Sequence, residues 1–230
     1  MPEDGFDRGT IRPVECLKEG FELLRNDYWL LFAVWLVGGL ISTISFLIVS
    51  GAMTAGIFYC YLKKIDGEKV SFDDLWKGMK WFFPGLLVMA LVALPMILVY
   101  AVIYVPVILS AVMGARLSQE ELMAMLIGAL VVDAVLIVIM VCIHSLLIFT
   151  FPLMIDRDLG PVRSMLLSAR TVFGNLAGVA GLLGLNFLLA VAGYLAFCIG
   201  IYFVVPILIA GTVVAYRKIF PRPGRPVLSA

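Results

Sequence analysis

Residues 172–216 read VFGNLAGVAGLLGLNFLLAVAGYLAFCIGIYFVVPILIAGTVVAY, and not one of these 45 side chains carries a charge. A helix that rises 1.5 Å per residue needs roughly 20 residues to cross the hydrocarbon core of a bilayer, which is about 30 Å thick. This stretch is too long for one crossing and long enough for two. We therefore expect it to form two membrane-spanning helices.

Three more tracts of the same kind lie upstream. Residues 28–62 and 81–115 are uncharged, and residues 122–155 are interrupted only by Asp133 and His144. Hydrophobic residues make up 63% of the chain and its mean hydropathy is +1.07, whereas soluble domains are roughly half apolar. This composition excludes a water-soluble protein and predicts an all-α, polytopic membrane protein.

The distribution of basic residues predicts how often the chain crosses, because cytoplasmic loops are enriched in lysine and arginine. Residues 28–62 have basic residues on both sides, so we interpret them as a hairpin of two short helices. Its turn is expected at the polar side chains Ser42, Thr43 and Ser45. Residues 81–115 are expected to cross once, and residues 122–155 to return.

The resulting model has six spans in three pairs and both termini in the cytoplasm. Residues 1–27, 63–80, 156–171 and 217–230 are cytoplasmic, and 16 of the 17 basic residues lie there, with Arg116 outside. A five-span model would put the first four basic residues outside, and an eight-span model would split the middle tracts. We favour six spans, a single domain of residues 1–230, and the inner or cell membrane.

Each predicted pair of spans is preceded by a short amphipathic segment that we expect to form a helix on the inner membrane surface. The segments begin near Pro13, Ser71 and Pro161, and Ser71 is predicted to cap the second one with Asp74. In each segment a leucine is followed three residues later by a small residue: Leu17 and Gly20, Leu75 and Gly78, and Leu166 and Ala169. We interpret this as a threefold internal repeat. The alternative is that any helix entering a membrane from its surface needs such a pattern.

Charge and cysteine content limit the classes of function. The net charge of +1, without a basic patch, predicts no nucleic-acid partner. The amphipathic segments are not jointly basic, so their anchoring should rest on buried apolar area. The four cysteines lie far apart without a CxxC pair, which favours buried free thiols. Residues 1–27 lack the apolar core of a cleavable signal peptide, so residue 28 is expected to start an uncleaved span.

Two segments of the chain resemble a known group of membrane proteins. Residues 56–78, GIFYCYLKKIDGEKVSFDDLWKG, and residues 151–162, FPLMIDRDLGPV, are similar to segments of uncharacterised prokaryotic six-span proteins. That group is similar to the enterobacterial YciC proteins and to the membrane domain fused to some glycerophosphodiester phosphodiesterases. The resemblance implies six spans and a bacterial or archaeal membrane. It implies no catalytic residue, because the phosphodiesterase chemistry belongs to a separate soluble domain.

Asp133, His144 and Asn186 are the candidate functional residues. A charged group near the bilayer centre costs at least a few kcal/mol, so such residues usually face protein or water. Asp133 and His144 would share one helical face about 16 Å apart, and together with Asn186 they could line a proton or cation path. The alternative that we favour is structural: Asp133 would lie near the outer interface and His144 near the inner one.

Small residues in two predicted spans favour helix packing over a substrate site. They include Gly51 and Gly56 in the second span, and Gly174, Gly178, Gly181 and Gly184 before Asn186 in the fifth. Pro152 and Pro206, near the inner ends of the fourth and sixth spans, are expected to mark hinges or helix ends.

The sequence contains no recognisable enzyme motif. It has one histidine and no GxSxG, HExxH or phosphate-binding GxxxxGK[ST] pattern, so we expect no enzyme activity, cofactor or metal. Asp156 and Asp158 could bind a cation, but capping the following helix is the simpler interpretation. We favour a non-enzymatic membrane protein that organises or assists other components, with membrane lipid and a membrane protein as partners. The alternative is a carrier or channel for a small solute, ion or lipid. Oligomeric state is not predicted.

Overall fold

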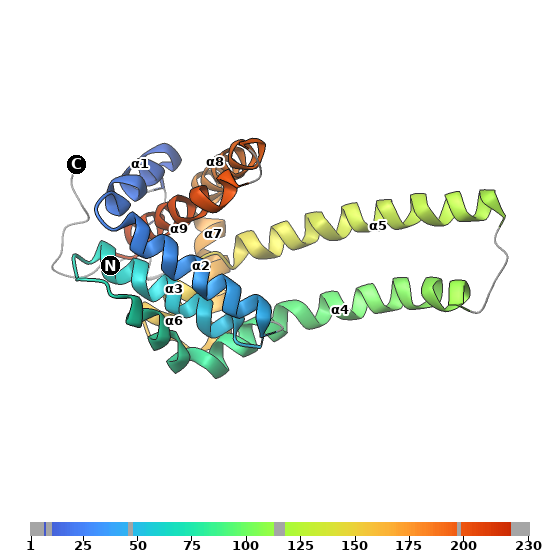
Figure 1. The fold of residues 1–230 in the computed structure, drawn as a ribbon, viewed down its shortest axis with the longest axis horizontal. Coiled ribbons are helices and arrows are strands. Elements are labelled where there is room, and N and C mark those ends of the chain that lie inside the picture. The colour runs from blue at the N-terminus through green and yellow to red at the C-terminus, as the bar shows by residue number, and fades with distance from the viewer. Residues whose placement is uncertain (1–6, 8–10, 46–47, 113–117, 197–198, 222–230) are drawn as a thin grey trace. The chain divides into compact units, whose positions relative to one another are not determined.

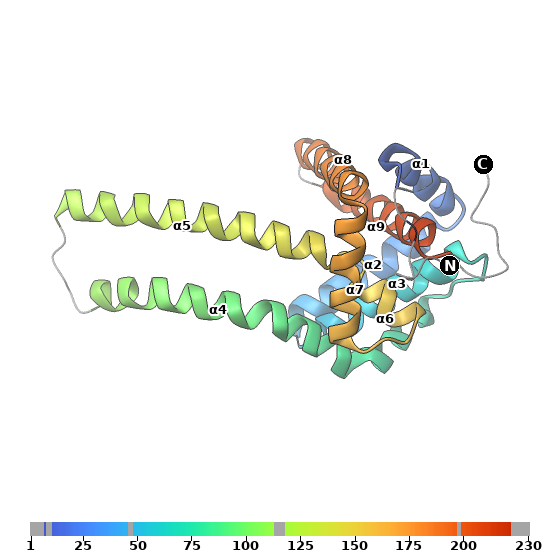
Figure 2. The same ribbon diagram turned by 180° about the vertical axis from the view of Figure 1, so that it is seen from behind.

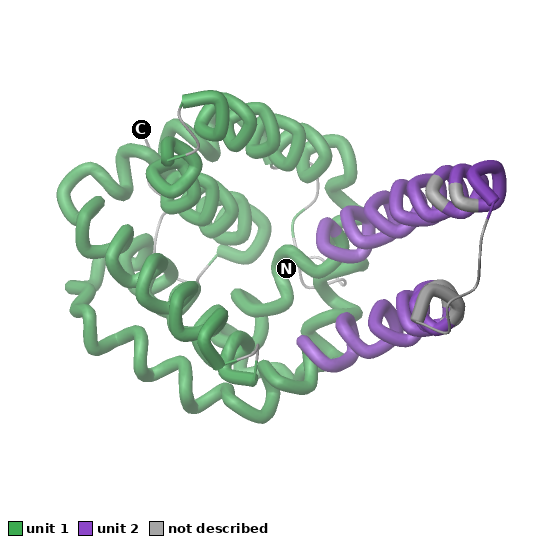
Figure 3. The backbone as a smooth tube through the Cα atoms, turned by 45° about the vertical axis from the view of Figure 1, so that its right-hand side comes forward, with its two compact units in different colours: residues 1–88, 146–230 green, residues 89–145 purple. Residues whose placement is uncertain are grey.

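The computed structural model describes residues 7, 11–45, 48–112, 118–196 and 199–221, which form helices and turns without a strand (Figure 1). The prediction of an all-α chain is confirmed. The chain forms two compact units, one of residues 1–88 and 146–230 and the other of residues 89–145 (Figure 3). The predicted single domain of residues 1–230 stays a prediction.

Most helices belong to the first unit. They are α1 (Pro13–Leu24), α2 (Tyr28–Ile44), α3 (Ser50–Ile65), the 3₁₀ helix η1 (Phe72–Trp81), α6 (Thr150–Asp156), α7 (Pro161–Gly174), α8 (Leu176–Leu195) and α9 (Gly200–Ile219). The second unit is a helical hairpin made by most of α4 (Phe82–Val112) and α5 (Gln119–Leu146).

Several helices have the length and composition of membrane spans. Among the residues that the structure describes, four stretches meet that description: Phe72–Val102, Gln119–Asp156, Leu176–Leu195 and Gly200–Ile219. A fifth is obtained if α1 and α2, which are bent by 100° at their junction, count as one broken span. α2 and α3 have 17 and 16 residues, or about 25 Å each, which is short for a hydrocarbon core of about 30 Å. The six-span count and its pairing therefore stay predictions.

The two uncharged tracts near the ends of the chain each contain two helices. Residues 28–62 form α2 and most of α3, and residues 172–216 contain α8 and most of α9. The turn between α2 and α3 begins slightly later than predicted. The hydroxyl groups of Ser42 and Thr43 donate to the carbonyl oxygens of Gly38 and Gly39, at 2.7 and 3.0 Å, so both residues remain inside α2.

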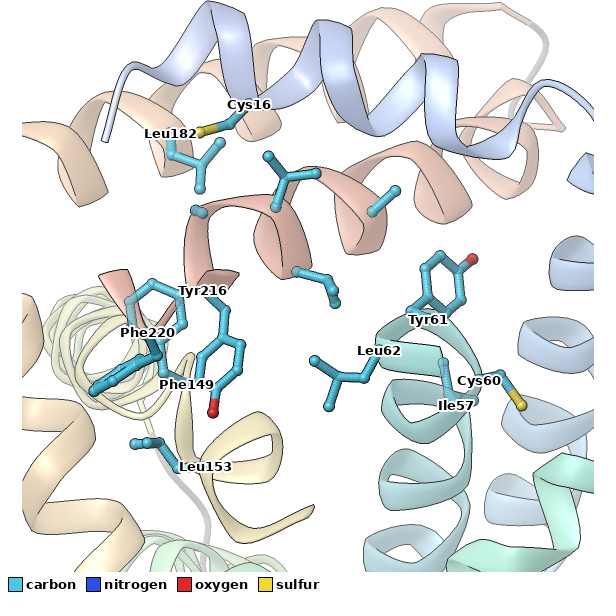
Figure 4. Close-up of a cluster of buried hydrophobic side chains, with 14 of the residues drawn as sticks. Cys16, Ile57, Cys60, Tyr61, Leu62, Phe149, Leu153, Leu182, Tyr216 and Phe220 are labelled. Carbon is cyan, nitrogen blue, oxygen red and sulfur yellow. The ribbon is translucent and has the colours of Figure 1, made fainter. Parts of the chain in front are cut away.

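The centre of the first unit is formed by α3, α6 and α9. α3 packs against both of the other helices. Figure 4 shows the rings of Phe149, Tyr216 and Phe220 close together, next to Leu62 of α3 and Leu153 of α6. The ring centroids of Phe149 and Tyr216 are 6.3 Å apart. Each central helix comes from the end of one predicted pair of spans.

The three amphipathic segments form helices that pack on these central helices in a cyclic order. α1 packs on α9, η1 on α3, and α7 on α6 (Figures 1 and 2). η1 and α7 each pack on the last helix of the preceding predicted pair of spans. α1 packs on the last helix of the third predicted pair. The shared packing is what a threefold internal repeat would produce.

In two of these contacts, the glycine of the predicted leucine and glycine pair lies against the backbone of the partner helix. A Cβ atom added at Gly20 would lie 2.7 Å from the backbone nitrogen of Gly211, and one added at Gly78 would lie 2.4 Å from that of Gly56. The third pair does not follow the pattern. Leu166 is 57% exposed, and α7 instead buries Ser164 and Ser168 against its partner.

The span predicted from residues 122–155 is broken near its end, where α5 stops at Leu146 and α6 starts at Thr150. Pro152 lacks the N–H group that a continuous helix would need there. Ser168 of α7 forms hydrogen bonds with the backbone groups at this break. Its hydroxyl group donates to the carbonyl of Leu146 at 2.7 Å and accepts from the N–H of Phe149 at 3.1 Å. Pro152 thus marks a helix end, whereas Pro206 lies inside α9.

Glycine packing agrees with the sequence interpretation at most positions that the structure describes. A Cβ atom would clash at Gly51 with Gly85, at Gly56 with Leu75, and at Gly178 and Gly181 with Ile11 and Pro13, while Gly184 faces open space. Cys16 and Cys60 are buried free thiols, and Cys142 is free but exposed. Arg8, Arg116, Cys198, Arg222 and Arg225 lie outside the described residues.

We expect Gly20→Ala to lower the free energy of unfolding by about 1–3 kcal/mol, the range for overpacking of a closely packed contact. The added methyl group would meet the backbone of α9 rather than a movable side chain. The matched control is Gly39→Ala, also within a helix, where a Cβ atom would meet nothing within 4 Å. Detergent-solubilised variants should be compared by denaturant titration. Equal stability of the two variants would contradict the close contact between α1 and α9.

Candidate functional site

Asp133 lies in the middle of α5, as the fifteenth of its 28 residues. The hydroxyl group of Tyr104, on α4, donates a hydrogen bond to Oδ1 of Asp133 at 2.6 Å. Tyr104 is itself stacked on Tyr100, with ring centroids 5.6 Å apart. The structure therefore gives Asp133 a polar partner on the other helix of its hairpin.

The other two candidate residues do not join this contact. His144 lies on the same helix as Asp133 and is exposed, but it is eleven residues further along, or about 16 Å. Asn186 lies on α8, in the first unit, and its Oδ1 atom is buried without a hydrogen-bond partner among the described residues. The structure brings Asp133 together with Tyr104, a residue that the sequence analysis did not select.

A second polar cluster lies where the three central helices end. The guanidinium group of Arg217, on α9, binds both carboxylate oxygens of Asp156, with N–O distances of 2.7 and 2.8 Å. One of its nitrogens also donates to Asp66, directly after α3, at 2.9 Å. Tyr216 donates its hydroxyl proton to Asp156 at 2.9 Å. The cluster thus contains one charged group from each of the three central helix ends.

Burial makes this cluster different from a surface ion pair. The side chains of Arg217, Asp156 and Asp66 are only 5%, 8% and 7% exposed. Paired and hydrogen-bonded charges are tolerated in such places, whereas removal of one partner leaves an uncompensated charge. The suggestion that Asp156 caps α7 is wrong, because the residue before that helix is Gly160 and no side chain caps it.

Further ion pairs attach the surface helices to the same helix ends. Lys218 of α9 binds Glu19 of α1 at 2.7 Å, and Lys63 of α3 binds Asp74 of η1 at 2.8 Å. Lys63 and Lys218 each lie seven residues after the glycine that contacts the same surface helix, Gly56 or Gly211. The two contacts therefore repeat one arrangement of glycine and lysine.

Asp74 is the most heavily hydrogen-bonded group of η1. It accepts bonds from Lys63, from Lys77 at 2.6 Å, and from the backbone N–H of Ser71 at 2.9 Å, which confirms the predicted capping pair. η1, the helix that carries Asp74, ends at Trp81, before the apolar helix α4 begins. Burial of Asp74 acts to raise its pKa, but the bonds from the two ammonium groups outweigh burial and hold the pKa below its usual range. The same contact with Asp74 raises the pKa of Lys77.

Each surface helix carries a second apolar strip that the protein does not cover. On α1, η1 and α7, large apolar side chains remain exposed next to the buried strip: Val14 and Phe21, Trp76 and Met79, and Val162, Leu166 and Phe173. A helix with one strip on protein and another exposed is suited to the membrane interface, where the exposed strip can enter the acyl region.

No family model, curated protein or solved structure matches this chain, so the resemblance to six-span prokaryotic proteins stays a prediction.

We expect Arg217→Gln to lower the free energy of unfolding by about 3–5 kcal/mol, because it removes the buried cation that binds the carboxylates of Asp156 and Asp66. Arg163→Gln, on the exposed side of α7, is the charge-matched control and should change stability by no more than about 0.5 kcal/mol. Denaturant titration of both variants in detergent measures the difference. A similar small effect for both would show that the cluster does not hold the central helices together.

Proposed function

We propose that this protein is a six-span integral membrane protein of a prokaryotic cell membrane, with both termini in the cytoplasm, that organises or assists other membrane components without catalysis. The observation that carries the proposal is the arrangement of α1, η1 and α7. Each is fixed to a central helix on one side and exposes apolar residues on the other. Three such helices form a collar that can hold lipid and a protein partner.

Topology supports this placement of the surface helices. The positive-inside rule puts the loops that contain η1 and α7 in the cytoplasm, together with the segment that contains α1. The 100° bend between α1 and α2 suits a helix that lies on the membrane before the chain enters it. The six-span topology requires the short helices α2 and α3 to cross, with local thinning of the bilayer or with flanking residues reaching the interface.

Rigid central helices favour an organising role over transport. Alternating access requires parts of a carrier to move against one another around a central site. Here a buried ion cluster joins the ends of α3, α6 and α9, through Asp66, Asp156 and Arg217. Opening this end would separate buried charges, which is strongly unfavourable.

The test is purification of the tagged protein from its native membranes in a mild detergent, followed by mass spectrometry of stoichiometric partners. We expect a defined membrane protein to remain bound. α7 has the largest exposed strip, so Leu166→Asn should reduce recovery of that partner about tenfold or more, as loss of an interface hot spot does. Recovery of lipid alone from the wild-type protein would overturn the organising role.

The control for this test is Leu195→Asn. Leu195 ends α8 and is 77% exposed, so the substitution makes the same chemical change away from the collar. It should leave partner recovery unchanged. Size-exclusion profiles of both variants check that loss of the partner does not come from unfolding. Equal loss in both variants would contradict a partner site on α7.

The hydrogen bond from Tyr104 to Asp133 favours a second candidate, a carrier or channel for an ion or small solute. An acid in the middle of a spanning helix can relay protons or bind cations. If this function is correct, Asp133→Asn should abolish proton flux into liposomes, measured with a pH-sensitive dye, while Asp133→Glu retains it. Flux through the wild-type protein no faster than through empty liposomes would exclude proton transport.

A further inference from the structure

A pocket with aromatic walls and two lysines lies between η1 and α3. It is lined by Tyr59, Trp76, Lys77, Lys80 and Trp81 and has a volume of about 390 Å³. All five residues belong to the first unit. The volume falls in the range of small-molecule sites, and it accommodates much more than one water molecule, whose share of liquid volume is about 30 Å³.

The lysines of the pocket retain hydrogen-bonding capacity. An ammonium group has three N–H donors, and Lys77 places its Nζ 2.6 Å from Oδ1 of Asp74. In the described part of the chain, the ion pair of Lys80 is a long contact of 3.8 Å with Asp158. The side chains of Lys80 and Asp158 are both mostly exposed. Such exposed pairs contribute little and exchange readily with another anion.

Aromatic rings hold the two ammonium groups in place. Lys77 Nζ lies 5.5 Å from the ring centroid of Tyr59, and Lys80 Nζ lies 5.0 Å from that of Trp81. The rings of Tyr59 and Trp81 are 6.0 Å apart. These contacts orient both ammonium groups in the lining of the pocket before any ligand binds. Tryptophan and tyrosine are also the residues enriched at the level of lipid headgroups.

The amphipathic segment around η1 is electrically balanced, but the fold separates its charges. Asp74 is 1% exposed and is shared between Lys63 and Lys77. Lys80, whose ion-pair partner in the described part of the chain is the exposed Asp158, adds a second positive charge to the pocket. Beside the pocket, Trp76, Met79 and Phe83 expose apolar side chains at helical spacings of three and four residues.

We propose that this pocket binds the phosphate group of an anionic phospholipid, with the ammonium groups of Lys77 and Lys80 on its oxygens. The acyl chains would run along the exposed apolar side chains of Trp76, Met79 and Phe83. The proposal rests on the proposed interfacial placement of η1, because that placement brings headgroup phosphates to the level of the pocket. Anionic lipid is favoured over zwitterionic lipid because a choline group would meet two cations.

A second hollow in the first unit differs from this pocket in the charges that line it. The hollow beside α1 has a volume of about 520 Å³ and is lined mainly by apolar residues of α1, α8 and α9. Its charged residues are Lys18 and Glu22, one of each sign. It has the apolar character to accept an acyl chain, but its balanced charge gives no reason to select an anion.

The experiment titrates the detergent-purified protein with short-chain phosphatidylglycerol below its micelle concentration and counts bound lipid by native mass spectrometry. We expect one tightly held phosphatidylglycerol, with weaker binding of short-chain phosphatidylcholine. Lys80→Gln should weaken phosphatidylglycerol binding about fivefold, the usual effect of one lysine near anionic lipid. The matched control is Lys69→Gln, an exposed lysine of the same loop that does not line the pocket, and it should bind like the wild type.

Equal binding by Lys80→Gln and Lys69→Gln would overturn the site, and so would equal binding of phosphatidylcholine by the wild-type protein. Competition by inorganic phosphate at the same concentration as the lipid would assign the pocket to free phosphate and overturn a lipid ligand. The result is independent of the partner experiment, because dissolved lipid monomers reach the pocket whether or not a partner protein exists.

Discussion

A buried arginine determines how the central helices of this protein can be arranged. The guanidinium group of Arg217 is planar and presents its donors in a fixed fork, so it fixes the direction as well as the distance of its carboxylate partners. Two nitrogens of the guanidinium group bind the carboxylate of Asp156, and one of them also binds Asp66. Because none of these charges can be left unpaired in a buried place, α3, α6 and α9 must end together.

The surface helices follow from this central arrangement. Once the ends of α3 and α9 are fixed, a glycine roughly two turns before each end is available for close contact with a surface helix. The next lysine along α3 or α9 then reaches an acid on the same surface helix. Gly56 and Lys63 receive η1 in this way, and Gly211 and Lys218 receive α1. α6 has no equivalent glycine. Instead, the hydroxyl group of Ser168 on α7 forms hydrogen bonds with the backbone at the break between α5 and α6. The threefold pattern is thus built by two different kinds of contact.

Hydrophobic pattern was sufficient to predict most helices of this fold, because uncharged tracts and amphipathic segments are local properties of the chain. The capping of η1 by Ser71 and Asp74 was likewise readable from adjacent residues. The partners of Asp133 and Arg217 were not, because Tyr104 and Asp156 lie far away in sequence and nothing local selects them. Asp156 illustrates the difference: its position before α7 suggested a cap, whereas a residue 61 positions later binds it. Pro152 indicated a hinge or helix end near the break after Leu146, but its hydrogen-bonding partner at the break, Ser168, could not be selected from the sequence.

The contact between α1 and α9 joins the first and the last of the helices that the structure describes. The backbone N–H of Asp7 also donates to the carbonyl of Ile219 at 3.0 Å, so the two regions are connected at more than one point. During synthesis α1 is made long before α8 and α9, the two helices on which it packs. The contact between α1 and α9 can form only after α9 has been synthesised, so formation of this contact is a late step in folding of the first unit.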